Sequence, residues 1–147
     1  MIHYVPMEER HVEAIAELEK VCFSDPWSVN SIRYELTNRL SYWLVAESDG
    51  QVVGYVGSQS VIDAADMMNI AVSPDFRRMG IACELINRLI DALKEKQVSC
   101  LTLEVRASNA GAIALYEQMG FALAGVRPNY YHNPKEDAKI MRKEWHL

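Results

Sequence analysis

The fold is decided between residues 69 and 82, which read Asn69-Ile70-Ala71-Val72-Ser73-Pro74-Asp75-Phe76-Arg77-Arg78-Met79-Gly80-Ile81-Ala82. Its beginning closes a predicted strand over about Ala65–Val72, Ser73-Pro74 interrupts that strand, and Gly80 opens a long predicted helix that runs to about Lys96. A helix start offers free N–H groups and a positive dipole end, and small residues there let a ligand approach the backbone. With two arginines just before it, this start suits a pyrophosphate. The pattern R-x-x-G-x-A is weak by itself, because glycine is common at helix starts.

Further strands and helices are predicted on both sides of this stretch. An Asp49-Gly50 turn between two β-rich runs predicts a hairpin, and Ser24-Asp25-Pro26 ends the first helix. The other predicted strands are Ile2–Val5, Tyr42–Glu47, Gln51–Ser58, Leu101–Val105, Phe121–Tyr130 and Ala138–Glu144, and the other helices are Met7–Cys22, Ser28–Asn38 and Asn109–Met119. The order is β-α-α-β-β-β-α-β-α-β-β. It predicts one α/β domain over residues 1–147, with a mixed central sheet of about seven strands and about four flanking helices.

Composition excludes several classes of protein. Among 147 residues, 50% are hydrophobic and 24% charged, which is typical of a globular chain. No apolar run reaches the roughly 20 residues that cross a bilayer, and no secretion signal opens the chain, so we expect a cytoplasmic protein without membrane contact. A net charge of −5 argues against direct binding of nucleic acid.

The distribution of charge and the positions of the cysteines say less about function than the composition does. Residues 1–75 are net acidic and residues 76–147 net basic, which fits an anionic ligand near the second half or an accidental asymmetry of a solvated surface. Cys83 and Cys100 are expected to be small buried residues, and the cysteines and histidines have no metal-ligand spacing. We therefore expect no metal site.

The chain resembles the GNAT superfamily of acetyl-coenzyme A-dependent N-acetyltransferases. Arg77, Gly80 and Ala82 fill the three positions of its signature, Q/R-x-x-G-x-G/A, and the run from Leu103 to Tyr116 followed by Gly120-Phe121 matches its second landmark. The resemblance implies acetyl-coenzyme A as co-substrate. It assigns cofactor contacts to Ile70, Ala71, Val72, Arg77, Arg78, Met79, Gly80, Ile81, Ala82, Asn109 and Tyr116.

Within the superfamily, the sequence is most similar to the bacterial ribosomal-protein-alanine N-acetyltransferases. Four segments carry this similarity: Cys22–Ser28, Asn69–Val72, Leu103–Asn109 and Arg127–Ala138. One departure is Ala82-Cys83, where many members have glycine and then a basic or polar residue. The similarity implies acetylation of a protein N-terminal α-amine, with a ribosomal protein as substrate, by a monomer or weak dimer.

The same resemblance assigns the chemistry. Glu104 would be the general base, acting through water, and Tyr116 the general acid toward the sulfur of coenzyme A. Alternatively, Glu104 is a solvated strand residue paired with Arg106, and Tyr116 is a core aromatic. Trp27 and Tyr131 would line the peptide slot, or else only pack.

Asn109 and the function itself each have a second interpretation. Asn109 would contact the cofactor or simply cap its helix. The substrate amine could belong instead to a lysine side chain, a polyamine or a small metabolite. A non-catalytic module that binds coenzyme A or a partner protein is the third possible function, although such a module would not need an acid and base pair.

Overall fold

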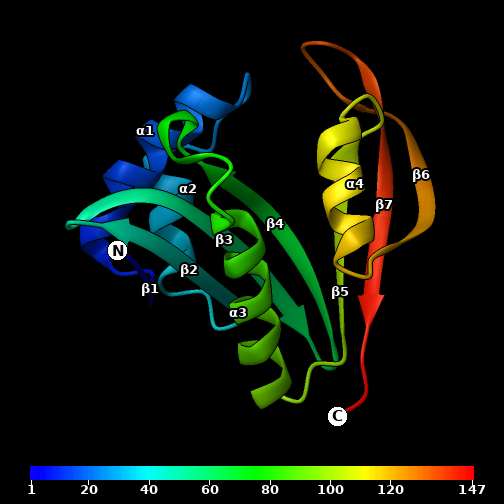
Figure 1. The fold of residues 1–147 in the computed structure, drawn as a ribbon, viewed down its shortest axis with the longest axis horizontal. Helices are drawn as coiled ribbons and strands as arrows, with labels where there is room; N and C mark the ends of the chain where they lie inside the picture. The colour runs from blue at the N-terminus through cyan, green and yellow to red at the C-terminus, as the bar shows by residue number, and fades with distance from the viewer.

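A seven-stranded mixed sheet in the order β1-β2-β3-β4-β5-β7-β6 forms the centre of the computed structural model, which describes residues 1–147 (Figure 1). The strands are β1 Ile2–Pro6, β2 Ser41–Ser48, β3 Gln51–Val61, β4 Ala64–Val72, β5 Cys100–Arg106, β6 Ala122–Tyr131 and β7 Glu136–Glu144. The helices are α1 Val12–Cys22, α2 Val29–Glu35, α3 Ile81–Glu95 and α4 Ala110–Gln118, with 3₁₀ turns at Glu9–His11 and Pro74–Phe76. Fold class, element types and their order are as predicted.

Two predicted helices are shorter in the structure. The helix predicted from Met7 begins at Val12, because the Met7 N–H still donates to the Trp43 carbonyl as an extension of β1 (2.9 Å). The helix predicted to reach Asn38 ends at Glu35, where the chain tightens into i to i+3 hydrogen bonds. The β2–β3 turn has positive φ at both Asp49 (50°) and Gly50 (78°), as a two-residue hairpin of this kind requires.

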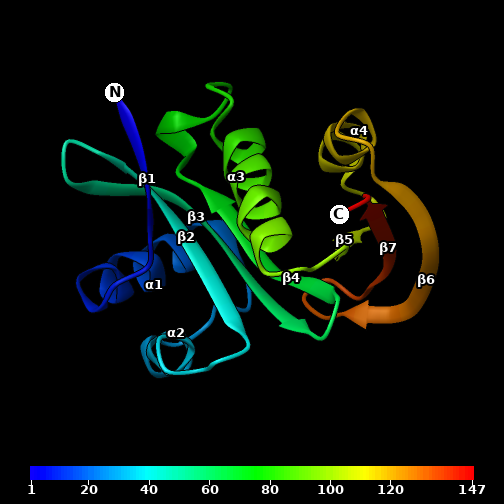
Figure 2. The ribbon, with the colours of Figure 1, turned by 90° about the horizontal axis from the view of Figure 1, so that it is seen from below.

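Two hydrophobic cores hold the layers together. Helices α3 and α4 lie on one face of the sheet, and α1 and α2 lie on the other (Figure 2). The first core includes Leu85, Leu89 and Leu103, and the second includes Ile15 and Trp43. Cys83 and Cys100 are only partly buried, so the expectation that both are buried residues was wrong. None of the helices combines the length and the apolar composition needed to cross a membrane.

The sheet opens between β4 and β5. These parallel strands pair only at Ala64–Asp66 with Cys100–Thr102, and beyond these residues they diverge into a V that Figure 1 shows clearly. In β4, Met67 pairs with Ser58 and Asn69 with Gly57, so Met68 is an extra, bulged residue. Because the strands diverge, the edge of β4 that faces β5 is unpaired beyond Asp66. This unpaired stretch contains Ile70, Ala71 and Val72, three of the predicted cofactor contacts.

Candidate active site

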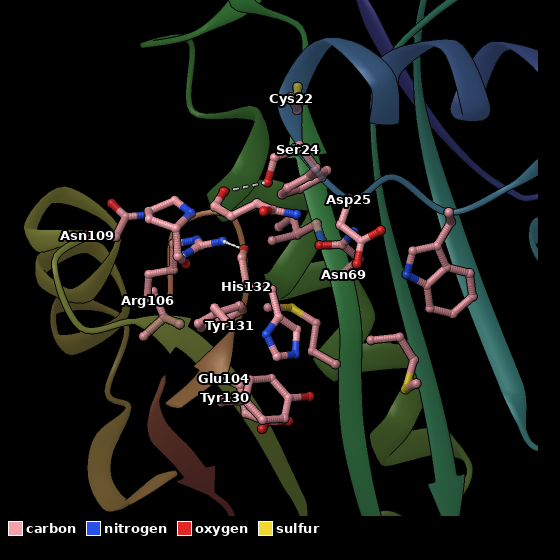
Figure 3. A pocket seen from close by; sticks show the side chains of 18 of the residues that line it. Cys22, Ser24, Asp25, Asn69, Glu104, Arg106, Asn109, Tyr130, Tyr131 and His132 are labelled. Atoms are coloured by element: carbon pink, nitrogen blue, oxygen red, sulfur yellow. Dashed lines mark hydrogen bonds between the residues drawn. The ribbon is translucent and has the colours of Figure 1, made fainter. Parts of the chain in front are cut away.

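A cavity of about 790 Å³ lies at the opening of the sheet. Its walls come from the end of α1 and the loop after it, from β4 and β5, from the start of α4, and from the β6–β7 connection (Figure 3). The Ser24 hydroxyl donates to the Asn133 carbonyl (3.0 Å), which joins the loop after α1 to the β6–β7 connection across the cavity. Six predicted site residues line it: Trp27, Ile70, Glu104, Asn109, Tyr116 and Tyr131.

The edge of β4 offers backbone donors to this cavity. The Ser73 N–H donates to the Val53 carbonyl (2.8 Å), and antiparallel pairs alternate between bonded and non-bonded. The register therefore engages Ala71 with β3 and turns the N–H groups of Ile70 and Val72 toward the gap. The Ile70 N–H is held by the Asn69 side-chain oxygen at 3.1 Å.

Glu104 reaches the cavity from β5. Its side chain is 29% exposed, and its Oε2 lies 2.7 Å from Nε of Arg127 on β6. This contact is an ion pair without hydrogen-bond geometry, and Oε2 accepts no hydrogen bond from any other group. The alternative pairing of Glu104 with Arg106 is wrong: Arg106 binds Glu136 (3.3 Å) and carbonyls of the β6–β7 connection.

Tyr116 belongs both to the core and to the cavity. It is 7% exposed and packs against Phe121, with ring centroids 5.8 Å apart, yet it lines the cavity. Burial raises the pKa of Tyr116 to about 12. The phenol therefore carries its proton at neutral pH, as a proton donor must.

Trp27 and Tyr131, which were predicted to line a peptide slot, each pack against another side chain. Trp27 packs edge-on against Trp43, with ring centroids 5.4 Å apart. Tyr131 lies under the guanidinium of Arg106 at 4.4 Å, and burial is the main reason that its pKa rises to about 12. Trp27 and Tyr131 therefore both pack against neighbouring side chains and line the cavity. Asn109 likewise caps α4 by accepting from the Ala112 N–H (3.2 Å) while it lines the cavity.

A second cavity of about 200 Å³ lies at the start of α3. The backbone has positive φ at Arg78 (65°) and at Gly80 (76°), which turns successive N–H groups toward one side. A Cβ added to Gly80 would meet nothing within 4 Å, so the space beside it is open to a ligand. The Arg77 side chain turns back and donates to the Val72 carbonyl (3.3 Å). Of the other predicted contacts, Ile81 and Ala82 line this cavity, and Met79 is exposed in the loop before it.

Sequence reasoning missed Glu19, Arg127 as the partner of Glu104, and the Ser24–Asn133 contact. Glu19 left a readable signal, because it lies on the apolar side of the first helix, four residues after Ile15. The other two contacts join segments more than 20 residues apart, and no local pattern encodes them.

An α/β domain has the parts of an acyltransferase that uses a nucleotide-linked donor when it combines an open helix start, a strand edge unpaired on one side, and a carboxylate and a phenol that line one cavity. The chain belongs to the acetyltransferase (GNAT) family, which residues 12–121 match.

Individual relatives agree with this assignment. The chain is 39% identical, over 92% of both chains, to the [ribosomal protein bS18]-alanine N-acetyltransferase of Escherichia coli K12. It resembles the crystal structure of the ribosomal-protein-S18-alanine N-acetyltransferase from Escherichia coli with a TM-score of 0.92 and 36% identity, covering 100% of this chain and 96% of the other. A chain of the NatC complex bound to Gag peptide and CoA is similar at 26% identity, with a TM-score of 0.85 and 99% of both chains covered.

Proposed function

We propose that this enzyme transfers the acetyl group of acetyl-coenzyme A to the N-terminal α-amine of a protein, namely the N-terminal alanine of a small-subunit ribosomal protein. The observation that carries the proposal is the cavity at the β4–β5 opening, where Glu104 and Tyr116 line one space beside the edge of β4 that is not paired with β5. The names of relatives that align over nearly the whole chain support the choice of substrate.

The residues present fit acetyl-coenzyme A, which would supply an activated acetyl thioester. The loop Arg77–Ala82, with its open space at Gly80, would hold the pyrophosphate. The Val72 N–H would donate to the acetyl carbonyl, and the Ile70 N–H would donate to the pantetheine arm in exchange for its present partner, Asn69. Asn109 would contact the same arm. The carbonyl gains negative charge as the amine attacks, so a fixed donor favours the transition state.

Glu104 and Tyr116 would handle the protons. An α-amine has a pKa of about 7.7–8.0, and it must lose a proton to attack a carbonyl. We propose that the carboxylate of Glu104, which forms an ion pair with Arg127, takes this proton through a water molecule. Tyr116, whose pKa is raised to about 12, would return a proton to the leaving sulfur.

The peptide would enter between Trp27 and Tyr131, whose rings are fixed by Trp43 and Arg106. The proposed reaction involves neither a metal, nor nucleic acid, nor a membrane. We place it in the cytoplasm and assign it to a monomer or weak dimer.

The decisive experiment incubates the protein with acetyl-coenzyme A and paired peptides, one with a free and one with a blocked N-terminus, both containing a lysine. Mass spectrometry should find one acetyl group on the α-amine of the free peptide and none on the blocked peptide. A modified lysine beside an untouched N-terminus would contradict the proposal and favour a lysine acetyltransferase. Binding of acetyl-coenzyme A without turnover on any amine would favour a non-catalytic module.

A further inference from the structure

Glu19 is a buried carboxylate that the proposed reaction does not use. It is 1% exposed, and no lysine, arginine or histidine forms an ion pair with it. Two donors satisfy it instead: the Trp27 N–H at 2.9 Å and the Asn69 side-chain Nδ2 at 2.7 Å. Burial raises the pKa of Glu19, and the two hydrogen bonds act in the opposite direction. A buried carboxylate is costly unless its acceptors are filled, so the arrangement calls for a reason.

The two donors belong to two different segments that line the large cavity. Trp27 belongs to the loop after α1 and Asn69 to β4, directly after the bulged Met68, and all three residues line the cavity. Glu19 itself lies behind them, in α1. One carboxylate therefore ties the loop that would contact the peptide to the strand that would contact the acetyl group.

The contact with Asn69 also fixes which way its amide points. Because Nδ2 donates to Glu19, the amide oxygen Oδ1 faces the other way and accepts from the Ile70 N–H at 3.1 Å. Were the amide reversed, its N–H₂ would meet the Ile70 N–H, and its oxygen would meet the carboxylate. The chain of contacts runs from Glu19 through Asn69 to a backbone donor that faces the gap between β4 and β5.

We infer that Glu19 is a positioning residue for acetyl transfer: its carboxylate holds the Trp27 backbone in place and orients Asn69, and through Asn69 it fixes the Ile70 N–H at the opening of the sheet. This inference rests on the proposed function for its kinetic consequence, but the hydrogen bonds that it invokes can be measured without turnover. Glu19 touches neither substrate nor cofactor.

Glu35 provides a matched control. It is also a buried carboxylate (6% exposed), and it accepts from the Ser41 hydroxyl (2.9 Å) and the Gln59 amide (2.7 Å). These contacts lie outside the large cavity. Glu35→Gln should therefore lower stability as Glu19→Gln does, while the backbone amides at the cavity stay as they are in the wild type.

The first measurement is amide hydrogen exchange at Trp27 and Ile70, without ligand. Glu19→Gln replaces one acceptor by a donor, so it should release Asn69 and make exchange at Ile70 about tenfold faster, while the oxygen that it keeps still accepts from the Trp27 N–H. Glu35→Gln should leave both amides unchanged. Asn69→Ala, at a less buried position, should release Ile70 alone and leave Trp27 protected. Unchanged exchange at Ile70 in both Glu19→Gln and Asn69→Ala would overturn the inference.

The double variant Glu19→Gln/Asn69→Asp reverses the polarity of the contact. The new amide on α1 would donate to the new carboxylate on β4, and that carboxylate would still accept from the Ile70 N–H. The oxygen of the new amide would still accept from the Trp27 N–H. Exchange at Ile70 should therefore return toward the wild-type rate, with Trp27 protected as in the single variant. A double variant that exchanges faster than Glu19→Gln would mean that polarity is not the cause, and it would refute the positioning role.

The second measurement is steady-state acetylation of a peptide with a free N-terminus. Glu19→Gln should lower kcat/KM roughly 10- to 100-fold through misplacement of the cavity walls. The double variant should recover most of this loss, and Glu35→Gln should lose little. A wild-type enzyme that leaves peptide N-termini unmodified would refute the proposed function, and the exchange rates would still decide the role of Glu19.

Discussion

Gly80 offers the sharpest test of where the anion binds. Its φ is +76°, and nothing lies within 4 Å of a Cβ built there. Asparagine and aspartate tolerate this left-handed region better than other residues, so Gly80→Asn and Gly80→Asp should both fold. The two variants have the same shape and differ by one negative charge.

The expected difference follows from Coulomb's law. Two unit charges about 4 Å apart interact by about 4 kcal/mol at an effective dielectric constant of 20. Gly80 is exposed, and we halve the figure for screening by solvent. Gly80→Asp should thus bind acetyl-coenzyme A about 2 kcal/mol more weakly than Gly80→Asn, which is roughly a thirtyfold higher Kd.

The affinity of both variants for acetyl-coenzyme A can be measured by calorimetry at low and at high salt. The difference in Kd between the two variants should shrink as the salt concentration rises. S-acetyl-pantetheine is the matched ligand, since it lacks the pyrophosphate and should bind both variants equally. Equal affinity of the two variants for acetyl-coenzyme A would show that no phosphate lies at the start of α3, and would refute the reasoning.

Three further predictions concern protons. Tyr116→Phe should keep the fold and acetyl-coenzyme A binding but lower kcat by about 10²–10⁴, with no recovery at higher pH; a wild-type rate would mean that the ring serves only for packing. Glu104→Gln should lose kcat over the same range and regain part of it as the pH rises, because more of the α-amine is then already neutral; a pH–rate profile parallel to the wild type would exclude Glu104 as the base. The pKa of Glu47 is lowered, first by its hydrogen bond from Arg10 and further by that from His11. A lowered folded pKa stabilises the protein above the unfolded value of about 4.3, and the stability is lost as the pH falls through the folded pKa. Urea unfolding between pH 6 and 3 should therefore show a smaller acid-dependent loss in Glu47→Gln than in the wild type, and equal losses would contradict this.

Local patterns were enough to predict the order of the elements. The turn at Asp49-Gly50, the break at Pro26 and the apolar spacing along α3 act within a few residues of the chain, and the structure contains all three features. Glycine at position 120 likewise ends α4 with a φ of 95°.

The site was predictable in its residue types and less so in its contacts. A helix start with Gly80 indicates a binding site for an anion. The opening between β4 and β5 depends instead on how these two strands pair, and the sequence of each strand alone is that of an ordinary strand. The alternative interpretation of Glu104 failed for the same reason: it paired Glu104 with Arg106, which is near in sequence, whereas Arg127 belongs to β6, two strands away in the sheet. Alternation along β4, which separates Ala71 from Ile70, likewise depends on the register with β3.

The three residue pairs that join β4 to β5 also have a mechanical meaning. They lie at one end of the V, and Met67 to Val72 extends from them for roughly 20 Å at 3.3 Å per residue, paired with β3 but not with β5. A rotation of about 5° about the closed end would shift the tip of this stretch by about 1.7 Å, without breaking a hydrogen bond inside either half of the sheet. The twist of the chain at Ala64–Asp66 therefore sets the width of the open end of the V, and the Ser24–Asn133 hydrogen bond is a contact that spans the cavity at this opening.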